Sequence, residues 1–245
     1  MQPSITSPKL PGSFIARKNE RWNSMHRIRN EPRTKDGLQT AGITLHWAGQ
    51  YDFFTALMGM GVNRPNSRMV VELAQIQPGD AVLDVGCGTG NLTLTAQTAA
   101  GPGGRVHGID ASPEMIETAK KKAARLNSLV VFDVGLIEQL AFPDATFDKV
   151  ISRLVIHHLP DDLKVKAFAE IRRVLKPGGR ILIADFIQPR NHVLNHITGA
   201  MVGSHMMQTD TWKLAPMLEE ACFTAVTAGP TRSAFLASVT GTKSQ

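Results

Sequence analysis

Three glycines stand at alternate positions directly after a short apolar run. The run is Val82 to Val85, and the glycines are Gly86, Gly88 and Gly90. Glycine has no Cβ, so it adopts positive φ and lets the atoms of another molecule approach the backbone closely. Between a buried strand and a helix, such a loop is typical of a site for a nucleoside-bearing ligand. Its spacing, Asp-x-Gly-x-Gly-x-Gly, differs from the Gly-x-Gly-x-x-Gly of dinucleotide binders, which argues against a nicotinamide-dependent dehydrogenase.

A carboxylate closes the next apolar run. Asp110 ends the predicted strand Arg105 to Asp110. An ionised carboxylate only accepts hydrogen bonds, and at this place it can bind both hydroxyls of a ribose. Ser112 and Pro113 then predict the start of a helix, because serine caps helix N-termini and proline suits the first helical position. The alternative for Asp110 is an acid that only caps this helix or a turn.

Two histidines follow the fourth predicted strand. This strand runs from Lys149 to Leu154, and His157 and His158 come shortly after it. In doubly wound folds the carboxyl ends of the central strands face the ligand crevice. Histidine titrates near neutral pH and is suited to proton transfer, so His157 is a candidate catalytic base. The alternative is a histidine that only hydrogen-bonds the backbone.

The intervening sequence supplies the elements that must position these residues. Residues 130–133 form a third apolar run, and helical periodicity begins after Asp161, the expected N-cap of a helix. A further strand is predicted from Arg180 to Phe186. Strands that alternate with helices at this pitch predict an α/β fold, with a parallel sheet and helices on both faces.

Several segments resemble the class I S-adenosylmethionine (SAM) dependent methyltransferases, and most of all the branch that includes the ubiquinone/menaquinone biosynthesis C-methyltransferases. They are "LDVGCGTG", "GIDASPEMIETA", "LAFPDATFD", "HHLPDD" and "EIRRVLKPGGRILIADF". The resemblance is strong over residues 51–186 and weak after them. It implies a Rossmann-like seven-stranded sheet, mostly parallel, with a C-terminal antiparallel hairpin. It also implies methyl transfer from SAM, with S-adenosylhomocysteine as product, to a small apolar or amphipathic molecule.

The resemblance implies a set of site residues as well. His157 falls where plant phenolic O-methyltransferases keep a general base. Leu136 departs from the pattern, because many relatives carry an acid there, so adenine is expected to rely on backbone acceptors or apolar packing. The expected cofactor-binding residues are Tyr51, Asp84, Gly86, Cys87, Gly88, Gly90, Asp110, Ala111, Met115, Gly135, Leu136, Ile137 and Arg153.

The chain is expected to divide into a basic arm, 1–44, and a methyltransferase domain, 45–245. Within the domain, 45–75 forms a lid and N-terminal helices, and 188–211 is an insertion on the acceptor side. Tyr51 matches a lid residue over the amino-acid end of the cofactor in relatives, and simple packing is its alternative. For the arm, a flexible extension, an organelle-targeting segment and a cover over the site all stay open.

Charge separates the arm from the domain. The net charge is +6, and residues 1–50 hold eight Lys or Arg against three acids, so the remainder is nearly neutral. A neutral domain argues against a nucleic-acid acceptor. A SAM-binding protein without catalysis stays open.

The cysteines, the histidines and the hydropathy of the chain indicate whether a membrane span, a metal site or an oxidising compartment is expected. Cys87 and Cys222 have no metal-ligand spacing, and no apolar run is long enough to span a bilayer, so a reducing, cytoplasmic location is expected. The segment containing His192, His196 and His205 lacks a fixed further ligand, so no metal site is expected.

Overall fold

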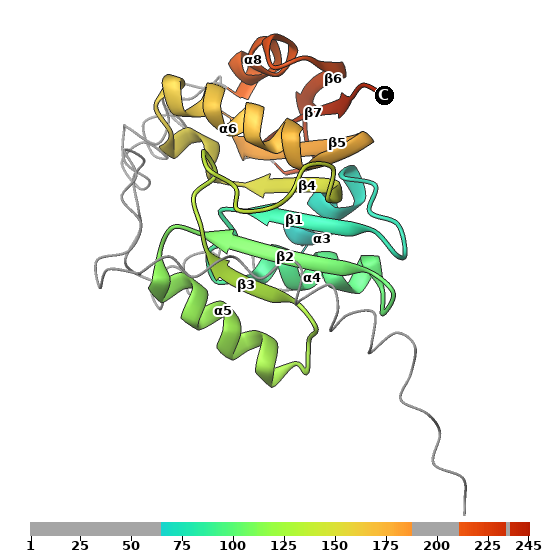
Figure 1. The fold of residues 1–245 in the computed structure, drawn as a ribbon, viewed down its shortest axis with the longest axis vertical. Coiled ribbons are helices and arrows are strands. Elements are labelled where there is room, and N and C mark those ends of the chain that lie inside the picture. Colours follow the sequence, from blue (N-terminus) through green and yellow to red (C-terminus); the bar gives the residue numbers. More distant parts are fainter. Residues whose placement is uncertain (1–64, 188–210, 234–235) are drawn as a thin grey trace, which may run out of the picture.

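A seven-stranded sheet organises residues 65–187, 211–233 and 236–245, which are the residues that the computed structural model describes (Figure 1). The strand order is β3-β2-β1-β4-β5-β7-β6. The first five strands in this order pair in parallel, and β7 pairs antiparallel with both β5 and β6. The strands are β1 Ala81–Val85, β2 Arg105–Asp110, β3 Val131–Val134, β4 Phe147–Arg153, β5 Leu175–Phe186, β6 Phe223–Pro230 and β7 Leu236–Lys243. The predicted fold class is confirmed.

Helices cover both faces of this sheet (Figure 1). They are α3 Pro65–Leu73, α4 Asn91–Ala100, α5 Pro113–Arg125, α6 Asp161–Val174 and α8 Leu214–Glu220, with the short 3-10 helices η1 Ile156–His158 and η2 Thr211–Lys213. Within the described residues, no helix combines the length and apolar character that crossing a bilayer requires.

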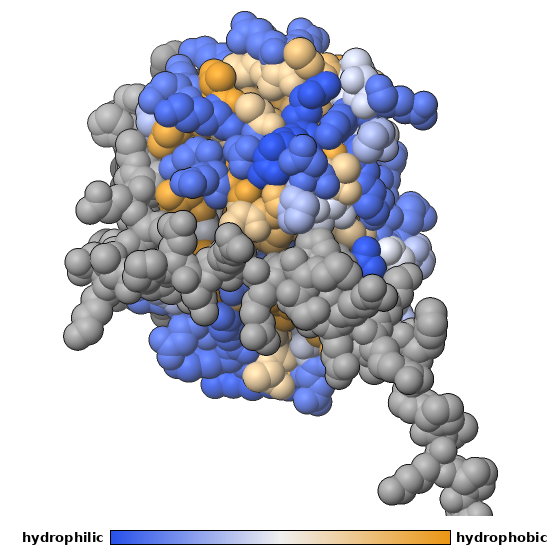
Figure 2. All heavy atoms as spheres, viewed as in Figure 1, coloured by the Kyte–Doolittle hydropathy of each residue, from blue (hydrophilic) through white to orange (hydrophobic). Residues whose placement is uncertain are grey.

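Alternation along the strands divides the core into two layers. Leu83 and Val85 of β1 face a cluster formed with α6 and α8, whereas Val82 faces a cluster formed with α3, α4 and α5. In α6 most apolar positions point inward, among them the fully buried Phe168 and Ile171, and Val165 is exposed. Figure 2 shows the outer surface on the side of α6 and α8 as mostly hydrophilic, with apolar atoms between.

The N-terminus of α5 lies where the sequence predicts it, whereas that of α6 differs by one residue. Ser112 caps α5, and its hydroxyl accepts a hydrogen bond of 3.3 Å from the N–H of Met115. Asp161 is not the cap of α6 as predicted. Pro160 takes that place, in an extended conformation, and Asp161 is the first helical residue. There Asp161 accepts from the Lys164 ammonium at 2.8 Å and lies where the helix dipole favours an acid.

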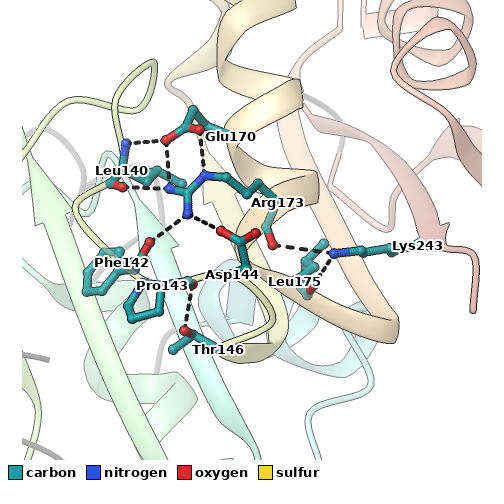
Figure 3. Close-up of polar contacts among 9 residues, drawn as sticks. All are labelled: Leu140, Phe142, Pro143, Asp144, Thr146, Glu170, Arg173, Leu175 and Lys243. Carbon is teal, nitrogen blue, oxygen red and sulfur yellow. Dashed lines mark hydrogen bonds and ion pairs between the residues drawn. The ribbon is translucent and has the colours of Figure 1, made fainter. Parts of the chain in front are cut away.

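The segment between β3 and β4 crosses one face of the sheet without a regular helix, and Arg173 of α6 fixes it (Figure 3). The guanidinium donates to the carbonyls of Leu140 and Phe142 at 2.8 Å each, and to the carboxylates of Asp144 and Glu170. Glu170 in turn accepts from the Leu140 N–H at 2.8 Å. Backbone groups that a helix would pair internally are therefore satisfied by two side chains of α6.

The parallel pairing brings four strand ends to one edge of the sheet. Val85 of β1 lies beside Ile109 of β2, and Asp84 lies beside Ile151 of β4. Arg153 of β4 lies beside Ala184 of β5. The glycine loop, Asp110, Arg153 and the end of β5 consequently share the carboxyl edge, where ligands bind in open α/β sheets.

Candidate active site

The glycine loop turns sharply between β1 and α4. Gly86, Gly88 and Gly90 all have positive φ, at 70°, 53° and 81°. The Cys87 N–H donates to the Ile109 carbonyl of β2 at 2.8 Å, and Gly90 occupies the N-cap position of α4. This is the conformation that the three-glycine spacing predicted.

Two of these glycines are also required by packing inside the protein. A Cβ on Gly86 would lie 2.4 Å from Val155 Cγ2, and a Cβ on Gly90 would lie 2.6 Å from Phe132. Real Cβ atoms do not come so close to a neighbour, so a side chain at either place would push the loop away from the strands beside it. The absence of side chains at the glycines of this loop therefore has two explanations. It leaves space for a ligand, and it leaves space for Val155 and Phe132.

A pocket that is open to solvent lies beside the loop. Four of the predicted site residues gather there, and three residues were not predicted. Those predicted are Asp84, Gly86, Cys87 and Arg153, and those not predicted are Thr89, Asn91 and Leu92. The missed residues follow the loop into the first turn of α4, so their position directly after the glycines is the signal that could have found them.

Asp84 is the charged group buried most deeply in this pocket. It is 1% exposed, and its Oδ2 accepts from the Thr93 hydroxyl at 2.6 Å. Its Oδ1 is buried and has no hydrogen-bond partner among the described residues. Burial raises the pKa of Asp84 to about 7, although the Thr93 hydroxyl and the charge of Arg153 act in the opposite direction. Buried acceptors without a donor are rare in proteins, and a donor group of a ligand would satisfy this one.

Arg153 brings a positive charge to the same pocket. Its guanidinium donates to the Ser67 hydroxyl of α3 at 2.8 Å. Leu154, the next residue, has φ of 60°, which is uncommon for a branched, bulky side chain. Its N–H donates to the Ala184 carbonyl at 2.9 Å, so the turn after β4 stays attached to β5.

Asp110 holds the glycine loop by hydrogen bonds. Its Oδ2 accepts from the Gly88 N–H at 2.8 Å, and its Oδ1 accepts from the Ser112 N–H at 2.9 Å. Burial raises the pKa of Asp110, and the Ser112 and Gly88 N–H groups oppose this rise. Each carboxylate oxygen has a second lone pair, so two acceptor positions are left for a ligand.

Lys122 of α5 supports the far side of the loop. Its ammonium donates to the side chains of Thr89 and Asn91 at 2.8 Å each. Both of these residues are buried and line the pocket. This contact has no signal in the sequence, because Lys122 is one of several basic residues at the end of α5.

The predicted adenine side lies beside Asp110. The Gly135 N–H donates to the Asp110 carbonyl at 3.0 Å, so the end of β3 is attached to the end of β2. Met115 is 3% exposed, and Ile137 is 7% exposed and belongs to the core cluster under α6. Gly135, Leu136 and Ala111 are half-buried.

His157 lies against the end of β5 and binds Asp185, a residue that the sequence analysis missed. Its Nδ1 lies 2.6 Å from Asp185 Oδ1, and its backbone N–H donates to Oδ2 at 3.1 Å. Both side chains are 1% exposed. The Nε2 atom of His157 is buried and has no hydrogen-bond partner among residues 65–187, 211–233 and 236–245.

His158 packs beside this pair. The two imidazole centroids are 4.0 Å apart. Burial lowers the pKa of His158 to about 4, and the neighbouring His157 adds to this effect. His158 is thus neutral at physiological pH.

Some predicted features fall outside the described residues. They are Tyr51, the arm, the part of the 45–75 segment that precedes residue 65, and the segment with His192, His196 and His205. Among the residues that are described, no three metal-ligating side chains lie together.

Known proteins match this fold and this loop. The sequence profile described as "Methyltransferase domain" matches residues 76–226, more than half of the chain. The chain belongs to the methyltransferase domain family. This methyltransferase domain is 34% identical over 158 residues to the ubiquinone/menaquinone biosynthesis C-methyltransferase of Teredinibacter turnerae, covering 64% of this chain and 63% of that protein. The predicted family is confirmed.

Another relative of the methyltransferase domain is named for a different substrate. An arsenite methyltransferase of Halobacterium salinarum is 34% identical over 180 residues, covering 71% of this chain and 43% of that protein. The chain spans less than two thirds of the length of both curated relatives. A SAM-dependent methyltransferase from Aquifex aeolicus has the same fold, with a TM-score of 0.62 at 20% identity over 80% of this chain and 96% of that chain.

SAM is the methyl donor of the class I methyltransferases, and the pocket of the methyltransferase domain fits it. The donor carries an α-ammonium, a carboxylate and a ribose. The buried, unpaired Oδ1 of Asp84 suits the ammonium, and the positive charge of Arg153 suits the carboxylate. The remaining lone pairs of Asp110 suit the ribose hydroxyls.

Proposed function

We propose that this chain transfers a methyl group from SAM to a small organic acceptor. The observation that carries the proposal is the Asp84 Oδ1 atom, which is buried without a partner in a pocket formed by the glycine loop. Family membership and the acidic end of β2 support it. When bound, the cofactor supplies a methyl group that is attached to a sulfonium sulfur. The acceptor takes this methyl group by in-line displacement, and the sulfur is the leaving group.

The residues of the chain bind and orient the cofactor. Asp84 and Arg153 would hold the methionyl end, together with Gly86, Cys87, Gly88 and Gly90. Asp110 would hold the ribose, and its contact with the Gly88 N–H keeps both parts of the site in one arrangement. Ala111, Met115, Gly135, Leu136 and Ile137 would lie beside the adenine, and Tyr51 over the methionyl end. Such positioning is the main contribution of a protein to a reaction whose chemistry resides in the cofactor.

The acceptor is proposed to be a small organic molecule. Relatives named for quinone biosynthesis and for arsenite support a small acceptor, and the nearly neutral domain offers no basic surplus for nucleic acid. A cytoplasmic location belongs to the same proposal, and the free thiols of Cys87 and Cys222 are in keeping with a reducing compartment.

One titration and one screen test the proposal. Isothermal titration with SAM and with NADH separates the cofactor classes, and we expect binding of SAM alone, in the low micromolar range or tighter as an order of magnitude. Incubation of the protein and methyl-labelled SAM with a metabolite extract then tests transfer. Binding without any labelled product would indicate a SAM-binding protein that does not catalyse.

A further inference from the structure

Asp185 is the last acidic residue of β5, and its carboxylate is surrounded by donors. Oδ1 accepts from the Phe186 N–H at 2.8 Å, and Oδ2 accepts from the His157 N–H at 3.1 Å. An ionised carboxylate only accepts hydrogen bonds. The contact of 2.6 Å between Oδ1 and His157 Nδ1 therefore needs a proton on Nδ1.

In a neutral imidazole, a proton on Nδ1 leaves Nε2 with a lone pair. This atom is buried and has no hydrogen-bond partner among the described residues, and leaving such an acceptor unpaired costs free energy. The neighbouring imidazole of His158 is neutral, because burial lowers its pKa to about 4, so it places no positive charge beside His157. A neutral imidazole in this tautomer is a proton acceptor, and it lies at the carboxyl edge that also carries the SAM pocket.

The fold fixes this orientation from two directions. The ring of His157 packs edge-on against Phe186, with centroids 5.3 Å apart, and its own backbone is tied to Asp185 through η1. A ring that is held at its Nδ1 and backbone by Asp185 and packed against Phe186 has little freedom to flip. In enzymes generally, an imidazole that acts as a base is often oriented by a carboxylate bound to its other nitrogen, and His157 and Asp185 have this arrangement.

We propose that Asp185 is a positioning residue that holds His157 in the Nδ1–H form, so that Nε2 takes a proton from the acceptor during methyl transfer. This inference rests on the proposed function. As the acceptor atom forms its bond to the methyl carbon, the carbon–sulfur bond breaks and its electron pair goes to sulfur. The acceptor's proton passes to Nε2, while Asp185 keeps its hydrogen bond to the imidazolium. The acceptor is accordingly a molecule that must lose a proton, such as a phenol or another hydroxyl compound.

The chain contains a matched control for this pair. His107 of β2 is 1% exposed, and its Nε2 lies 2.9 Å from Oδ2 of Asp133 on β3. This second histidine–aspartate pair joins β2 to β3, with His107 buried and Asp133 partly exposed. In the sheet, β1 and β4 lie between this pair and β5, which carries Asp185. Asp185→Asn and Asp133→Asn therefore remove the same charge from the same kind of contact in two places.

The test begins with a measurement that needs no substrate. Protein labelled with ¹⁵N in its imidazoles is compared by NMR as wild type, Asp185→Asn and Asp133→Asn, and the His157 signals are assigned by their loss in His157→Asn. We expect wild-type His157 to have its proton on Nδ1, and this tautomer to change in Asp185→Asn but not in Asp133→Asn. A wild-type His157 with its proton on Nε2, or a tautomer that Asp185→Asn leaves unaltered, would overturn the assignment.

Transfer of label from SAM into a metabolite extract gives the second measurement. Asp185→Asn should reduce it about a hundredfold or more, with SAM affinity within about twofold of wild type and with Asp133→Asn close to wild type. His157→Asn should be as impaired, because its amide nitrogen can replace Nδ1 as the donor to Asp185 but nothing replaces Nε2. Normal transfer by folded Asp185→Asn would refute the positioning role. If wild type binds no SAM or labels nothing, the proposed function has failed, and the tautomer still decides the role of Asp185.

Discussion

The Asp110 carboxylate accepts a hydrogen bond of 2.8 Å from the backbone N–H of Gly88. This hydrogen bond holds the end of β2 and the glycine loop together, although Gly88 and Asp110 are 22 positions apart in the chain. A substitution at Asp110 acts on the ligand directly and also on the loop that surrounds the ligand.

Asp110→Ala should weaken the binding of SAM and of S-adenosylhomocysteine. The ribose hydroxyls lose their acceptor, and hydrogen bonds to a charged group contribute about 1.5 to 3 kcal/mol. Calorimetric titration measures the change. Asp80→Ala is the control, because Asp80 also accepts a backbone N–H, from Gln77 at 2.8 Å, but precedes β1 at the opposite edge. Unchanged affinity in a folded Asp110→Ala protein would remove this residue from the site.

Gly88→Val should abolish cofactor binding. Gly88 has φ of 53°, and a branched side chain adds both backbone strain, on the order of 1–3 kcal/mol, and bulk in the ligand's space. Gly178→Val separates these effects, because Gly178 has φ of 75° and open space around its Cβ position, far from the pocket. We expect the two variants to lose similar stability in urea, but only Gly88→Val to lose SAM binding. Equal retention of binding would mean that Gly88 does not face the ligand.

Gly86→Ala should destabilise the domain by roughly 2–6 kcal/mol, the sum of overpacking against Val155 and backbone strain. Combining it with Val155→Gly removes the Val155 atoms that would lie 2.4 to 2.9 Å from the new Cβ. A double-mutant cycle in urea should therefore show a coupling of at least about 1 kcal/mol. Additive effects would indicate that the turn after β4 moves away at little cost. Gly101→Ala, at φ of 66° and in open space, reports the strain alone.

Asp84→Asn should stabilise the free protein at alkaline pH and weaken SAM binding. The pKa of Asp84 is raised from 3.8 to about 7 by burial. Between these values the folded form holds a proton that the unfolded chain has lost, so this group's contribution to stability falls as the pH rises toward 7. Asparagine carries no such charge, and its advantage over aspartate should grow between pH 5 and pH 8 by at most about 1.4 kcal/mol per pH unit. Urea unfolding at both pH values measures it, and a constant difference would contradict the raised pKa.

The parts of the fold that follow from local patterns could be predicted from the sequence. Ser112 and Pro113 mark the start of α5 by capping chemistry that involves only their neighbours. The alternation of strands and helices gave the parallel part of the sheet. β5 begins at Leu175, earlier than the predicted Arg180, because Leu175 pairs with Phe147 before a register shift in the ladder. Such a pairing is a property of two strands and has no signature in either one.

In the candidate site, too, the features that follow from local sequence patterns were predicted, and those that depend on contacts between distant segments were not. The glycines and Asp110 lie next to each other because two short sequence motifs end at the same edge of the sheet. Asp185 was missed because its partner lies 28 residues earlier, and the meaning of an acid in an apolar strand depends on what faces it. The signal was present, since Asp185 stands at the carboxyl end of a predicted central strand. The contact of Lys122 with Thr89 and Asn91 had no comparable signal.

The Arg173 network restricts where the chain can vary in length. Connecting segments usually tolerate insertions and deletions, because few fixed contacts depend on their spacing. The crossing between β3 and β4 is an exception, since all five N–H groups of one planar guanidinium are used and three of their acceptors lie within Leu140, Phe142 and Asp144. One residue added between 140 and 144 would shift these acceptors out of register with a rigid donor. Homologous chains should accordingly keep the length of this crossing constant and differ in length in their other connections.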